Sequence, residues 1–321
     1  MNVFLGIDLG SVSTNVVVMD EHREVLYKLY LRTQGQPIPT VRKGLALLVK
    51  ELGSDLKIRG VGTTGSGRHL AGILLGADSV KNEITAHAVA AGQVGPGVQT
   101  VLEIGGQDSK IIILREGVVV DFAMNTVCAA GTGSFLDQQA GRLGIPIEEF
   151  GPQALKATVP VRIAGRCSVF AESDMIHKQQ MGHKLPDILA GLCDALVRNY
   201  LNNVGKGKEI LAPVVFQGGV AANEGIRAAF AKSLGLEVIV PPYFDVMGAI
   251  GAAILAQEQV AGGQPTSFRG LQVLEQDFGT GSFECQGCPN NCEVIEIRSA
   301  GRTIARWGDR CGKWNRITDA S

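Results

Sequence analysis

The sequence predicts an α/β protein whose two similar halves face each other across a cleft. A strand, a polar turn and a second strand, with glycine and aspartate near the bend, occur around residue 9 and again around residue 106. Segments with the apolar spacing of helices follow both. The composition agrees, because 45% of the 321 residues are hydrophobic and 19% are charged, so the chain can bury a large core. We therefore expect a duplicated two-lobe fold.

The first half is predicted to contain three strands and a helix, followed by a glycine-rich loop. Apolar and β-branched runs indicate the strands, and Gly10 and Ser11 form the turn between the first two. Val41, Leu45 and Leu48 recur at helical spacing. The strands are expected at residues 3–8, 15–19 and 24–32, the helix at 40–52, and a short run into the loop at 59–62.

The second half repeats this pattern and continues with a longer series of helices. Its first strands surround a polar turn and are expected at residues 101–105, 110–114 and 118–124. Later helices are expected at residues 133–143, 168–178, 186–204, 223–232 and 246–259, and later strands at 210–217 and 237–240. The two halves share a pattern and not a repeated sequence.

These elements divide the chain into three parts. A linker of small and polar residues at 261–267 ends the series of helices, and the chain beyond it is rich in glycine, cysteine and charge, with little apolar sequence for a core. We expect an N-terminal lobe over residues 1–95, a C-terminal lobe over 96–260, and a small cysteine-rich appendage over 261–321.

Charge and hydropathy exclude several classes of partner. The 30 basic and 31 acidic residues give a formal net charge of −1, which offers no overall attraction to nucleic acid or to an anionic membrane. No apolar stretch is long enough to span a membrane, and the N-terminus lacks the features of a signal peptide. We therefore expect a cytoplasmic protein without nucleic acid or membrane partners.

Three glycine-rich turns have the composition of phosphate-binding loops. GIDLGSVST, residues 6–14, and IGGQDSK, residues 104–110, each offer backbone N–H groups for phosphate oxygens and a carboxylate for Mg²⁺. FQGGVAANEG, residues 216–225, is a glycine-rich turn between a strand and a helix. A glycine hairpin turn explains each one alone equally well. GVGTTG at residues 60–65 does not favour a dinucleotide fold, since no strand ending in an acidic residue follows it, and a P-loop sequence is absent.

In order and spacing these turns resemble the phosphate and adenosine elements of the acetate kinase, sugar kinase, Hsp70 and actin superfamily. Three further motifs narrow the likeness: NEITAHA at residues 82–88, MNTVCAAGTGSFLDQQA at 124–140 and CSVFAESDMI at 167–176. Together they resemble the ATP-dependent activators of 2-hydroxyacyl-CoA dehydratases, a family related to the ATPase subunits of benzoyl-CoA reductase. The resemblance covers residues 3–258 and implies the two-lobe fold of that superfamily, with ATP or ADP in the cleft.

The resemblance implies roles for residues of the turns. Asp8 would hold Mg²⁺, and Gln107 and Asp108 would position the γ-phosphate or the attacking water. The nucleotide would be held by Ser11, Val12, Ser13, Thr14 and Asn15, by Gly105 and Gly106, by Gly218, Gly219, Val220 and Ala221, and by Glu172 and Asp245. Asn15 and Asp245 stand where the family commonly has lysine and glutamine, so one counter-charge for phosphate is missing.

Cys128 and Cys167 each lie just before a predicted helix. The partial positive charge and free N–H groups of a helix N-terminus stabilise thiolates. Two cysteines cannot complete a four-thiolate iron–sulfur site, and two buried structural cysteines are the alternative interpretation. The resemblance implies one [4Fe-4S] cluster at the axis of a homodimer, with both cysteines of each chain as ligands.

The resemblance also implies the activity. Such a protein couples ATP hydrolysis to the transfer of one electron from ferredoxin or flavodoxin to an iron–sulfur partner enzyme. The changed residues around Cys128 fit a double-cubane-cluster reductase as acceptor as well as a dehydratase. The alternatives are a small-molecule kinase of the same superfamily, for example one that acts on N-acetylglucosamine, and a nucleotide-gated regulatory module without turnover. The kinase requires a sugar site and a general base, and no convincing sugar-site motif is present.

The appendage carries four cysteines in a pattern typical of metal ligands. Cys285, Cys288 and Cys292 have the spacing C-x₂-C-x₃-C, and Cys311 follows after a predicted hairpin. Zinc, an iron–sulfur cluster and free thiols are the open alternatives. The seventh cysteine, Cys193, lies on an amphipathic helix and is expected in the core.

Overall fold

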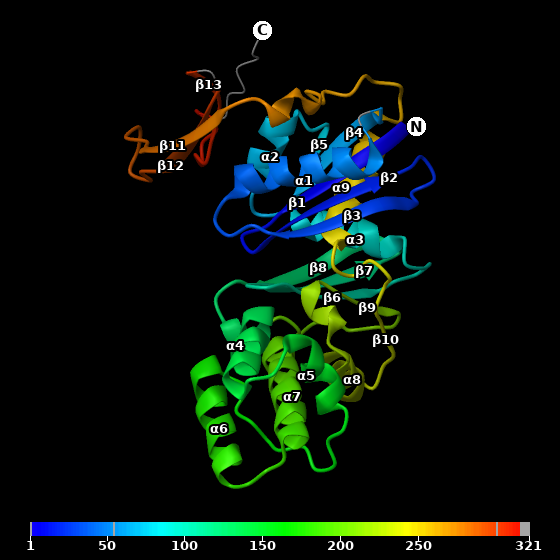
Figure 1. The fold of residues 1–321 in the computed structure, drawn as a ribbon, viewed down its shortest axis with the longest axis vertical. Coiled ribbons are helices and arrows are strands. Elements are labelled where there is room, and N and C mark those ends of the chain that lie inside the picture. The colour runs from blue at the N-terminus through cyan, green and yellow to red at the C-terminus, as the bar shows by residue number, and fades with distance from the viewer. Residues whose placement is uncertain (1, 54, 300, 315–321) are drawn as a thin grey trace.

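The computed structural model describes residues 2–53, 55–299 and 301–314 and contains two lobes, each built on a five-stranded mixed sheet (Figure 1). The first sheet has the order β3-β2-β1-β4-β5 and the second the order β8-β7-β6-β9-β10. In each sheet the first strand in the chain pairs antiparallel with the second and parallel with the fourth. The two sheets therefore share one topology, which confirms the predicted duplicated α/β fold.

Apart from β5, which the sequence does not predict, the strands of the two sheets agree with the expected segments within a few residues. Those of the first sheet are β1 (Asn2–Leu9), β2 (Ser13–Met19), β3 (Val25–Arg32), β4 (Lys57–Thr64) and β5 (Ser79–Val80). Those of the second sheet are β6 (Thr100–Ile104), β7 (Ser109–Arg115), β8 (Val118–Asn125), β9 (Val214–Gln217) and β10 (Val238–Ile239). The largest difference is at β9, which begins at Val214 and not at residue 210.

Helices cover the sheets and fill the space between the lobes (Figure 1). The α-helices are α1 (Pro37–Leu52), α2 (Arg68–Leu75), α3 (Glu83–Gly92), α4 (Gly133–Leu143), α5 (Ile147–Ala154), α6 (Ser168–Gln180), α7 (Leu185–Asn203), α8 (Glu224–Leu234) and α9 (Met247–Val260), and the 3₁₀ helices are η1 (Ala129–Gly131), η2 (Gly219–Ala222) and η3 (Leu271–Leu274). The sequence pattern does not predict α5, which is short and contains Pro152. Within the described residues, no helix combines the length and apolar character that crossing a membrane requires.

The last helix, α9, returns to the first sheet and packs against β1 and β4. Its apolar residues share a core cluster with Phe4 and Val17. A Cβ atom on Gly6 or Gly62 would lie 1.9 Å from a carbonyl oxygen of α9, so this close approach requires glycine on both strands. The expected lobe boundary at residue 260 stays a prediction. The chain passes from the first sheet to the second through α3 and returns through α9, and these two helices pack against each other.

The two lobes differ most between their third and fourth strands. In the first lobe α1 makes this connection, whereas in the second lobe α4, α5, α6 and α7 lie between β8 and β9. These helices pack around Phe135, Phe150 and Leu192 and share one core with the second sheet through Leu102 and Ile111. The inserted helices are therefore part of the second lobe's core, and both predicted cluster cysteines lie in this inserted segment.

The appendage is an antiparallel sheet of β11 (Phe278–Glu284), β12 (Glu293–Ser299) and β13 (Arg302–Trp307). The prediction that this part has little core is wrong, because Phe278, Ile297 and Ile304 are buried in the core cluster of the first lobe. The Asp78 carboxylate also accepts hydrogen bonds from the Thr266 hydroxyl and from the backbone N–H of Ser267, each at 2.7 Å. The appendage therefore packs on the first lobe and shares its core.

Candidate nucleotide and cluster site

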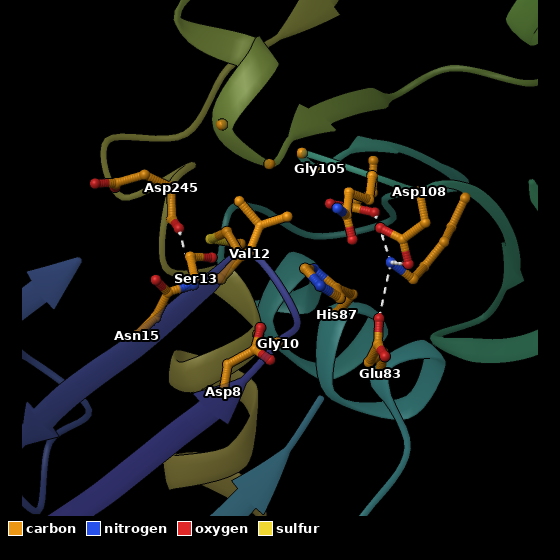
Figure 2. A pocket seen from close by; sticks show the side chains of 18 of the residues that line it. Asp8, Gly10, Val12, Ser13, Asn15, Glu83, His87, Gly105, Asp108 and Asp245 are labelled. Atoms are coloured by element: carbon orange, nitrogen blue, oxygen red, sulfur yellow. Dashed lines mark hydrogen bonds and ion pairs between the residues drawn. The ribbon is translucent and has the colours of Figure 1, made fainter. Parts of the chain in front are cut away.

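The turns between the first two strands of each sheet face each other across a pocket (Figure 2). Ser11, from the first turn, donates a hydrogen bond from its hydroxyl to Oε1 of Gln107, from the second turn, at 3.0 Å. The predicted nucleotide residues that line this pocket are Asp8, Ser11, Val12, Ser13, Asn15, Gly105, Gly106, Gln107, Asp108, Gly218, Gly219 and Asp245. The structure thus brings residues from distant parts of the chain together at one site.

Four of the predicted nucleotide residues do not line this pocket: Thr14, Glu172, Val220 and Ala221. Thr14 is wholly buried, and its hydroxyl lies 3.0 Å from that of Thr33. Its neighbours on β2 line the pocket, and the alternation of side chains along a strand turns Thr14 to the other face. Glu172 lies on α6 and pairs with Arg142 Nε at 2.8 Å. Its side chain braces α4 against α6.

A second cavity adjoins the pocket and shares Val12 and Gly219 with it. The glycine-rich turn after β9 lines one side with Val220, whereas the next residue, Ala221, is buried and does not line it. Arg32, at the end of β3, lines the cavity from the first lobe, and the sequence motifs do not predict it. An elongated ligand with phosphates between the two turns would extend into this cavity.

Asp8 lies half-buried at the floor of the pocket, next to the start of α9. A Cβ atom on Gly248 would lie 2.2 Å from Asp8 Oδ2, so a larger residue at the start of the helix would displace the Asp8 carboxylate. Burial, helped by the nearby charge of Glu83, raises the pKa of Asp8 to about 7. A carboxylate that is costly to ionise alone is well suited to hold a divalent cation, which supplies the missing positive charge.

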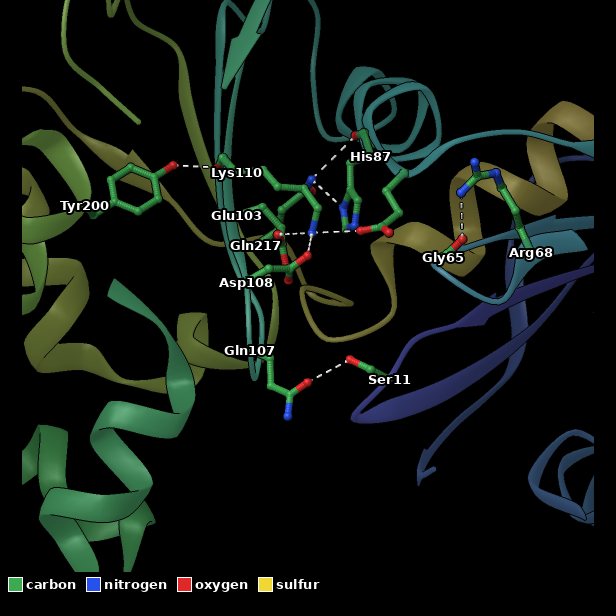
Figure 3. Close-up of polar contacts among 11 residues, drawn as sticks. Ser11, Gly65, Arg68, His87, Glu103, Gln107, Asp108, Lys110, Tyr200 and Gln217 are labelled. Carbon is green, nitrogen blue, oxygen red and sulfur yellow. Dashed lines mark hydrogen bonds and ion pairs between the residues drawn. The ribbon is translucent and has the colours of Figure 1, made fainter. Parts of the chain in front are cut away.

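Lys110 is the internal cation of the pocket. Its Nζ lies 3.0 Å from Glu103 Oε2 and 2.8 Å from Asp108 Oδ2 (Figure 3). It also lies 2.8 Å from Glu83 Oε2. The side chain is 2% exposed, and although burial opposes its charge, these carboxylates hold its pKa above the ordinary value. The predicted site residues do not include Lys110, Glu83 or Glu103. A local signal exists for two of them: Lys110 closes the motif IGGQDSK, and Glu103 is the acidic residue in the strand that precedes this motif.

His87, on α3, lies beside this charge cluster and is neutral at pH 7. Burial, with the nearby charge of Lys110, lowers its pKa to about 3. Its Nδ1 lies 2.9 Å from Nε2 of Gln217, the last residue of β9. This hydrogen bond ties α3 to the second sheet at the pocket.

Asn15 and Asp245, the two departures from the family pattern, lie together at the edge of the pocket (Figure 2). Asn15 Nδ2 lies 3.4 Å from the carbonyl oxygen of Asp245, and Asn15 Oδ1 is buried with no hydrogen-bond partner in the described chain. The Asp245 carboxylate pairs with Lys28 Nζ at 2.8 Å. The described chain therefore leaves a buried acceptor unsatisfied at the phosphate end of the pocket.

The phosphate turn of the second lobe is bonded directly to the helix that follows Cys128. The backbone N–H of Gly133 donates to Gly105 O at 2.9 Å, and the N–H of Ser134 donates to Gly106 O at 2.8 Å. The Ser134 hydroxyl donates to the same Gly106 oxygen at 2.6 Å. A displacement of this turn therefore acts on the start of α4 and on the loop that leads to it.

Cys128 and Cys167 both precede a helix, as predicted: Cys128 is the N-cap residue of η1, and Cys167 is that of α6. Both are partly exposed, and Cys128 Sγ lies 3.8 Å from the carbonyl oxygen of Arg166, the residue before Cys167. The two cysteine loops therefore lie side by side.

Apolar side chains next to the two cysteines are open to the outside. Val127 is 95% exposed, Val169 is 65% exposed and Phe170 is 67% exposed. Two accessible thiols on one apolar surface fit half of the four-thiolate donor set of a cubane cluster, with the other half supplied from outside the chain.

The four cysteines of the appendage lie on two neighbouring loops. Cys285 and Cys292 face each other across the tip of the β11–β12 hairpin, where Cys285 N donates to Cys292 O at 2.8 Å. The indole N–H of Trp314 lies 3.2 Å from Cys285 Sγ, and this bond, helped by the Gly287 N–H, lowers the pKa of the Cys285 thiol. Among the described residues, no three histidine, cysteine or acidic side chains gather as a metal site, so a tail metal stays a prediction.

Comparison with known proteins gives one consistent result. The family model of the BadF/BadG/BcrA/BcrD ATPase family matches residues 5–256. The chain is similar to the (R)-2-hydroxyglutaryl-CoA dehydratase activating ATPase of Acidaminococcus fermentans, with 35% identity over 266 residues that cover 80% of this chain and 98% of that protein. It is also similar to the activator of lactoyl-CoA dehydratase from Anaerotignum propionicum, with 33% identity over 256 residues that cover 79% of this chain and 97% of that protein.

A solved structure supports the same interpretation. The activator of the 2-hydroxyisocaproyl-CoA dehydratase from Clostridium difficile with bound ADPNP is similar with a TM-score of 0.72 and 31% identity, over 82% of this chain and 97% of that chain. These findings confirm the predicted resemblance and favour an activator ATPase over a small-molecule kinase. The family match ends at residue 256, before the linker and the appendage.

Proposed function

The chain belongs to the BadF/BadG/BcrA/BcrD ATPase family, and from this we propose that it is an ATPase that drives one-electron transfer into an iron–sulfur partner enzyme. The acceptor is a 2-hydroxyacyl-CoA dehydratase-like or double-cubane-cluster enzyme of the cytoplasm, and the donor is ferredoxin or flavodoxin. One observation carries the proposal: the turn for the phosphates is bonded to the start of α4, five residues beyond Cys128. Nucleotide chemistry and the cysteine pair are therefore mechanically connected.

Pocket residues from both lobes take part in hydrolysis. Asp8 holds Mg²⁺ from the first lobe, and Asp108 faces it from the second. Backbone N–H groups of the two glycine-rich turns bind the phosphates. Gln107 orients the attacking water through its amide, which Ser11 positions at 3.0 Å from the opposite turn. The Gly218–Gly219 turn lies along the adenosine.

The cysteine pair supplies the redox half of the proposal. Cys128 and Cys167 of two chains together hold one [4Fe-4S] cluster at the axis of a homodimer, and the cluster supplies one-electron chemistry when it is bound. The exposed Val127, Val169 and Phe170 surround this position and become buried when two chains meet. Movement of the lobes around the nucleotide changes the loops that present the thiols.

The proposal is tested by anaerobic purification, iron analysis and EPR of the dithionite-reduced protein with ADP and with ATP. We expect about four iron atoms per dimer, and a reduced-cluster signal that changes with the nucleotide. The signal disappears in Cys128→Ala and in Cys167→Ala. Cys193→Ala is the matched control, because this thiol is buried in the core and its removal leaves the signal in place. A protein that hydrolyses ATP but holds no cluster dependent on Cys128 and Cys167 would contradict the redox role.

For the appendage we propose a separate metal site formed by Cys285, Cys288, Cys292 and Cys311. The lowered pKa of Cys285 supports this, since a thiolate is the form that binds a metal. Zinc and iron analysis of Cys288→Ser, in a Cys128→Ala background, distinguishes metal bound by the appendage from the iron of the dimer cluster. Loss of zinc or of residual iron identifies the metal, and no metal in the parent protein identifies free thiols.

A further inference from the structure

One turn of α7 contacts both the nucleotide pocket and the cysteine loops. Tyr200 is wholly buried, and its hydroxyl donates a hydrogen bond to the backbone carbonyl of Lys110 at 2.6 Å (Figure 3). The preceding residue, Asn199, directs its amide nitrogen at the cysteine loops. Its Nδ2 lies 2.6 Å from Gly165 O and 3.6 Å from Cys128 Sγ. Adjacent residues of one helix therefore reach the pocket strand and a predicted cluster ligand.

The surroundings of Asn199 fix its amide in one orientation. Asn199 Oδ1 accepts a hydrogen bond from Asn203 Nδ2 at 2.9 Å, so the Asn199 N–H groups face the loops. The side chain is 3% exposed, which keeps bulk water from competing for these contacts. Both loops also meet α7 at glycine. A Cβ atom on Gly131 would lie 2.7 Å from Asn199 Oδ1, and one on Gly165 would lie 2.8 Å from the carbonyl oxygen of Ala195.

We propose that Asn199 is a positioning residue for the cluster ligands and that Tyr200 couples it to the nucleotide pocket. The proposal rests on the proposed function, because it assigns Asn199 a role toward a cluster held by Cys128 and Cys167. Asn199 Nδ2 contacts Cys128 Sγ and also lies 3.5 Å from the carbonyl oxygen of Arg166, which precedes Cys167. One side chain thus sets the two ligand loops relative to each other.

The N–H group next to Cys128 also has an electrostatic effect. Reduction adds a negative charge to the cluster and its thiolates, and a hydrogen-bond donor at a ligand sulfur stabilises that charge. Removing the donor therefore shifts the reduction potential to a more negative value. A merely structural role for Asn199 would change iron content or folding without this directed shift.

Tyr200 provides a path by which the nucleotide changes this arrangement. Lys110 O belongs to β7, and the Lys110 side chain holds Asp108 in the phosphate turn at 2.8 Å. A nucleotide that draws Asp108 toward its cation shifts this strand, and the buried Tyr200 bond passes the shift to α7. Two discrete positions of this helix turn would place the Asn199 amide nearer to or farther from Cys128 Sγ.

The first experiment measures the reduction potential of the cluster by EPR-monitored titration in wild type, Asn199→Leu and Asn199→Asp. Both variants remove the N–H donor. Asn199→Leu does so without adding charge, whereas Asn199→Asp keeps the shape of the side chain if Asn199→Leu does not fold and adds a carboxylate that shifts the potential in the same direction. We expect full iron content and a reduction equilibrium constant that falls about tenfold, equivalent to about 59 mV. Asn202→Leu, on an exposed face of the same helix, is the matched control and keeps the wild-type potential. Folded, iron-loaded variants with the wild-type potential would overturn the role of Asn199.

The second experiment uses the metal-free protein and measures backbone hydrogen exchange over residues 126–132 with and without ADPNP. We expect the nucleotide to change exchange in this loop in wild type and in the control Tyr243→Phe, and this change to be lost in Tyr200→Phe. A Tyr200→Phe protein that still shows the full change would overturn the coupling role.

The wild-type protein distinguishes failure of the proposed function from failure of this inference. A wild type that binds no cluster overturns the proposed function and this inference with it. A wild type with a nucleotide-sensitive cluster whose potential is the same in all Asn199 variants overturns the inference and leaves the proposed function standing.

Discussion

The two lobes place an acidic side chain at the same point of their sheets and surround it differently. Asp8 is next to last in β1 and pairs with Asn15 across the hairpin, whereas Glu103 is next to last in β6 and pairs with Lys110. Burial raises the pKa of both acids, to about 7 for Asp8 and to about 8 for Glu103. At this point the second lobe supplies a cation of its own, Lys110, whereas the first lobe supplies the amide of Asn15. The duplicated framework thus keeps Glu103 for an internal cation and leaves Asp8 available for an external one.

The same comparison separates the two activities. Both lobes contribute a glycine-rich turn to the nucleotide pocket, so nucleotide binding uses what the lobes share. The cysteine pair lies in the segment between β8 and β9, for which the first lobe has α1. The proposed redox function therefore belongs to what distinguishes the second lobe, and the proposed coupling has to pass from shared elements to inserted ones.

The largest effect is expected from removing the charge of Asp8. In Asp8→Asn we expect ATP hydrolysis to fall about 100-fold or more, because an amide is a poor ligand for Mg²⁺. Steady-state phosphate release at saturating Mg²⁺ measures this. Glu51→Gln, an exposed acid on α1, is the control and keeps wild-type activity. Hydrolysis within a few fold of wild type in Asp8→Asn would show that another residue holds the cation.

The second lobe is tested by removing its internal cation. Lys110→Met leaves Glu83, Glu103 and Asp108 without their buried partner, and we expect the unfolding free energy to fall by about 3–5 kcal/mol. Urea unfolding measures it, and adding Glu103→Gln in the double variant recovers part of the loss. The control Lys208→Met breaks a surface ion pair with Asp121, which solvent screens, and costs far less. Equal losses in Lys110→Met and Lys208→Met would refute an internal counter-ion.

The unfolding free energy measured over a range of pH tests the raised pKa of Asp8. The pKa of Asp8 rises from 3.8 to about 7 on folding, so between pH 4 and pH 7 the unfolded chain has released this proton and the folded chain retains it. The unfolding free energy contributed by Asp8 therefore falls as the pH rises through this window. Without nucleotide and metal, we expect Asp8→Asn to gain on the order of 3 kcal/mol over wild type between pH 4.5 and pH 7.5. Parallel stability curves for the two proteins would contradict a raised pKa.

The framework of both lobes was predictable because its signals are local. Continuous apolar and β-branched runs mark β1, β2 and β6 to β8, and glycine marks their turns, so each hairpin can be recognised without knowing its neighbours. The same reliance on local pattern explains why Thr14 was predicted to hold the nucleotide, although it lies away from the pocket. The motif predicts a continuous loop, whereas Thr14 already belongs to β2, and the period of two on a strand turns every second side chain away from the pocket.

What could not be predicted depends on contacts between distant segments. A lysine such as Lys110 is ordinarily exposed, and its burial follows only when α3, β6 and the phosphate turn meet around it. Asn199 carries no local signal either, since an asparagine on an amphipathic helix is commonplace until the loops of Cys128 and Cys167 are placed against it. In the appendage the apolar residues were too few to suggest a core, because they complete the core of the first lobe.

The smallest effect is expected from giving the first lobe the cation that the second one has. Asn15 occupies the position that corresponds to Lys110, and its Oδ1 is buried without a hydrogen-bond partner in the described chain, so its replacement forfeits little. Asn15→Lys adds a counter-charge beside the phosphates, and we expect ADP to bind about 3- to 10-fold more tightly, or about 1 kcal/mol, by calorimetry. Asn15→Met adds a similar length without charge and leaves the affinity at the wild-type value. If Asn15→Lys weakens ADP binding, the added ammonium pairs with Asp8 and displaces Mg²⁺, and the first lobe then depends on having no internal cation.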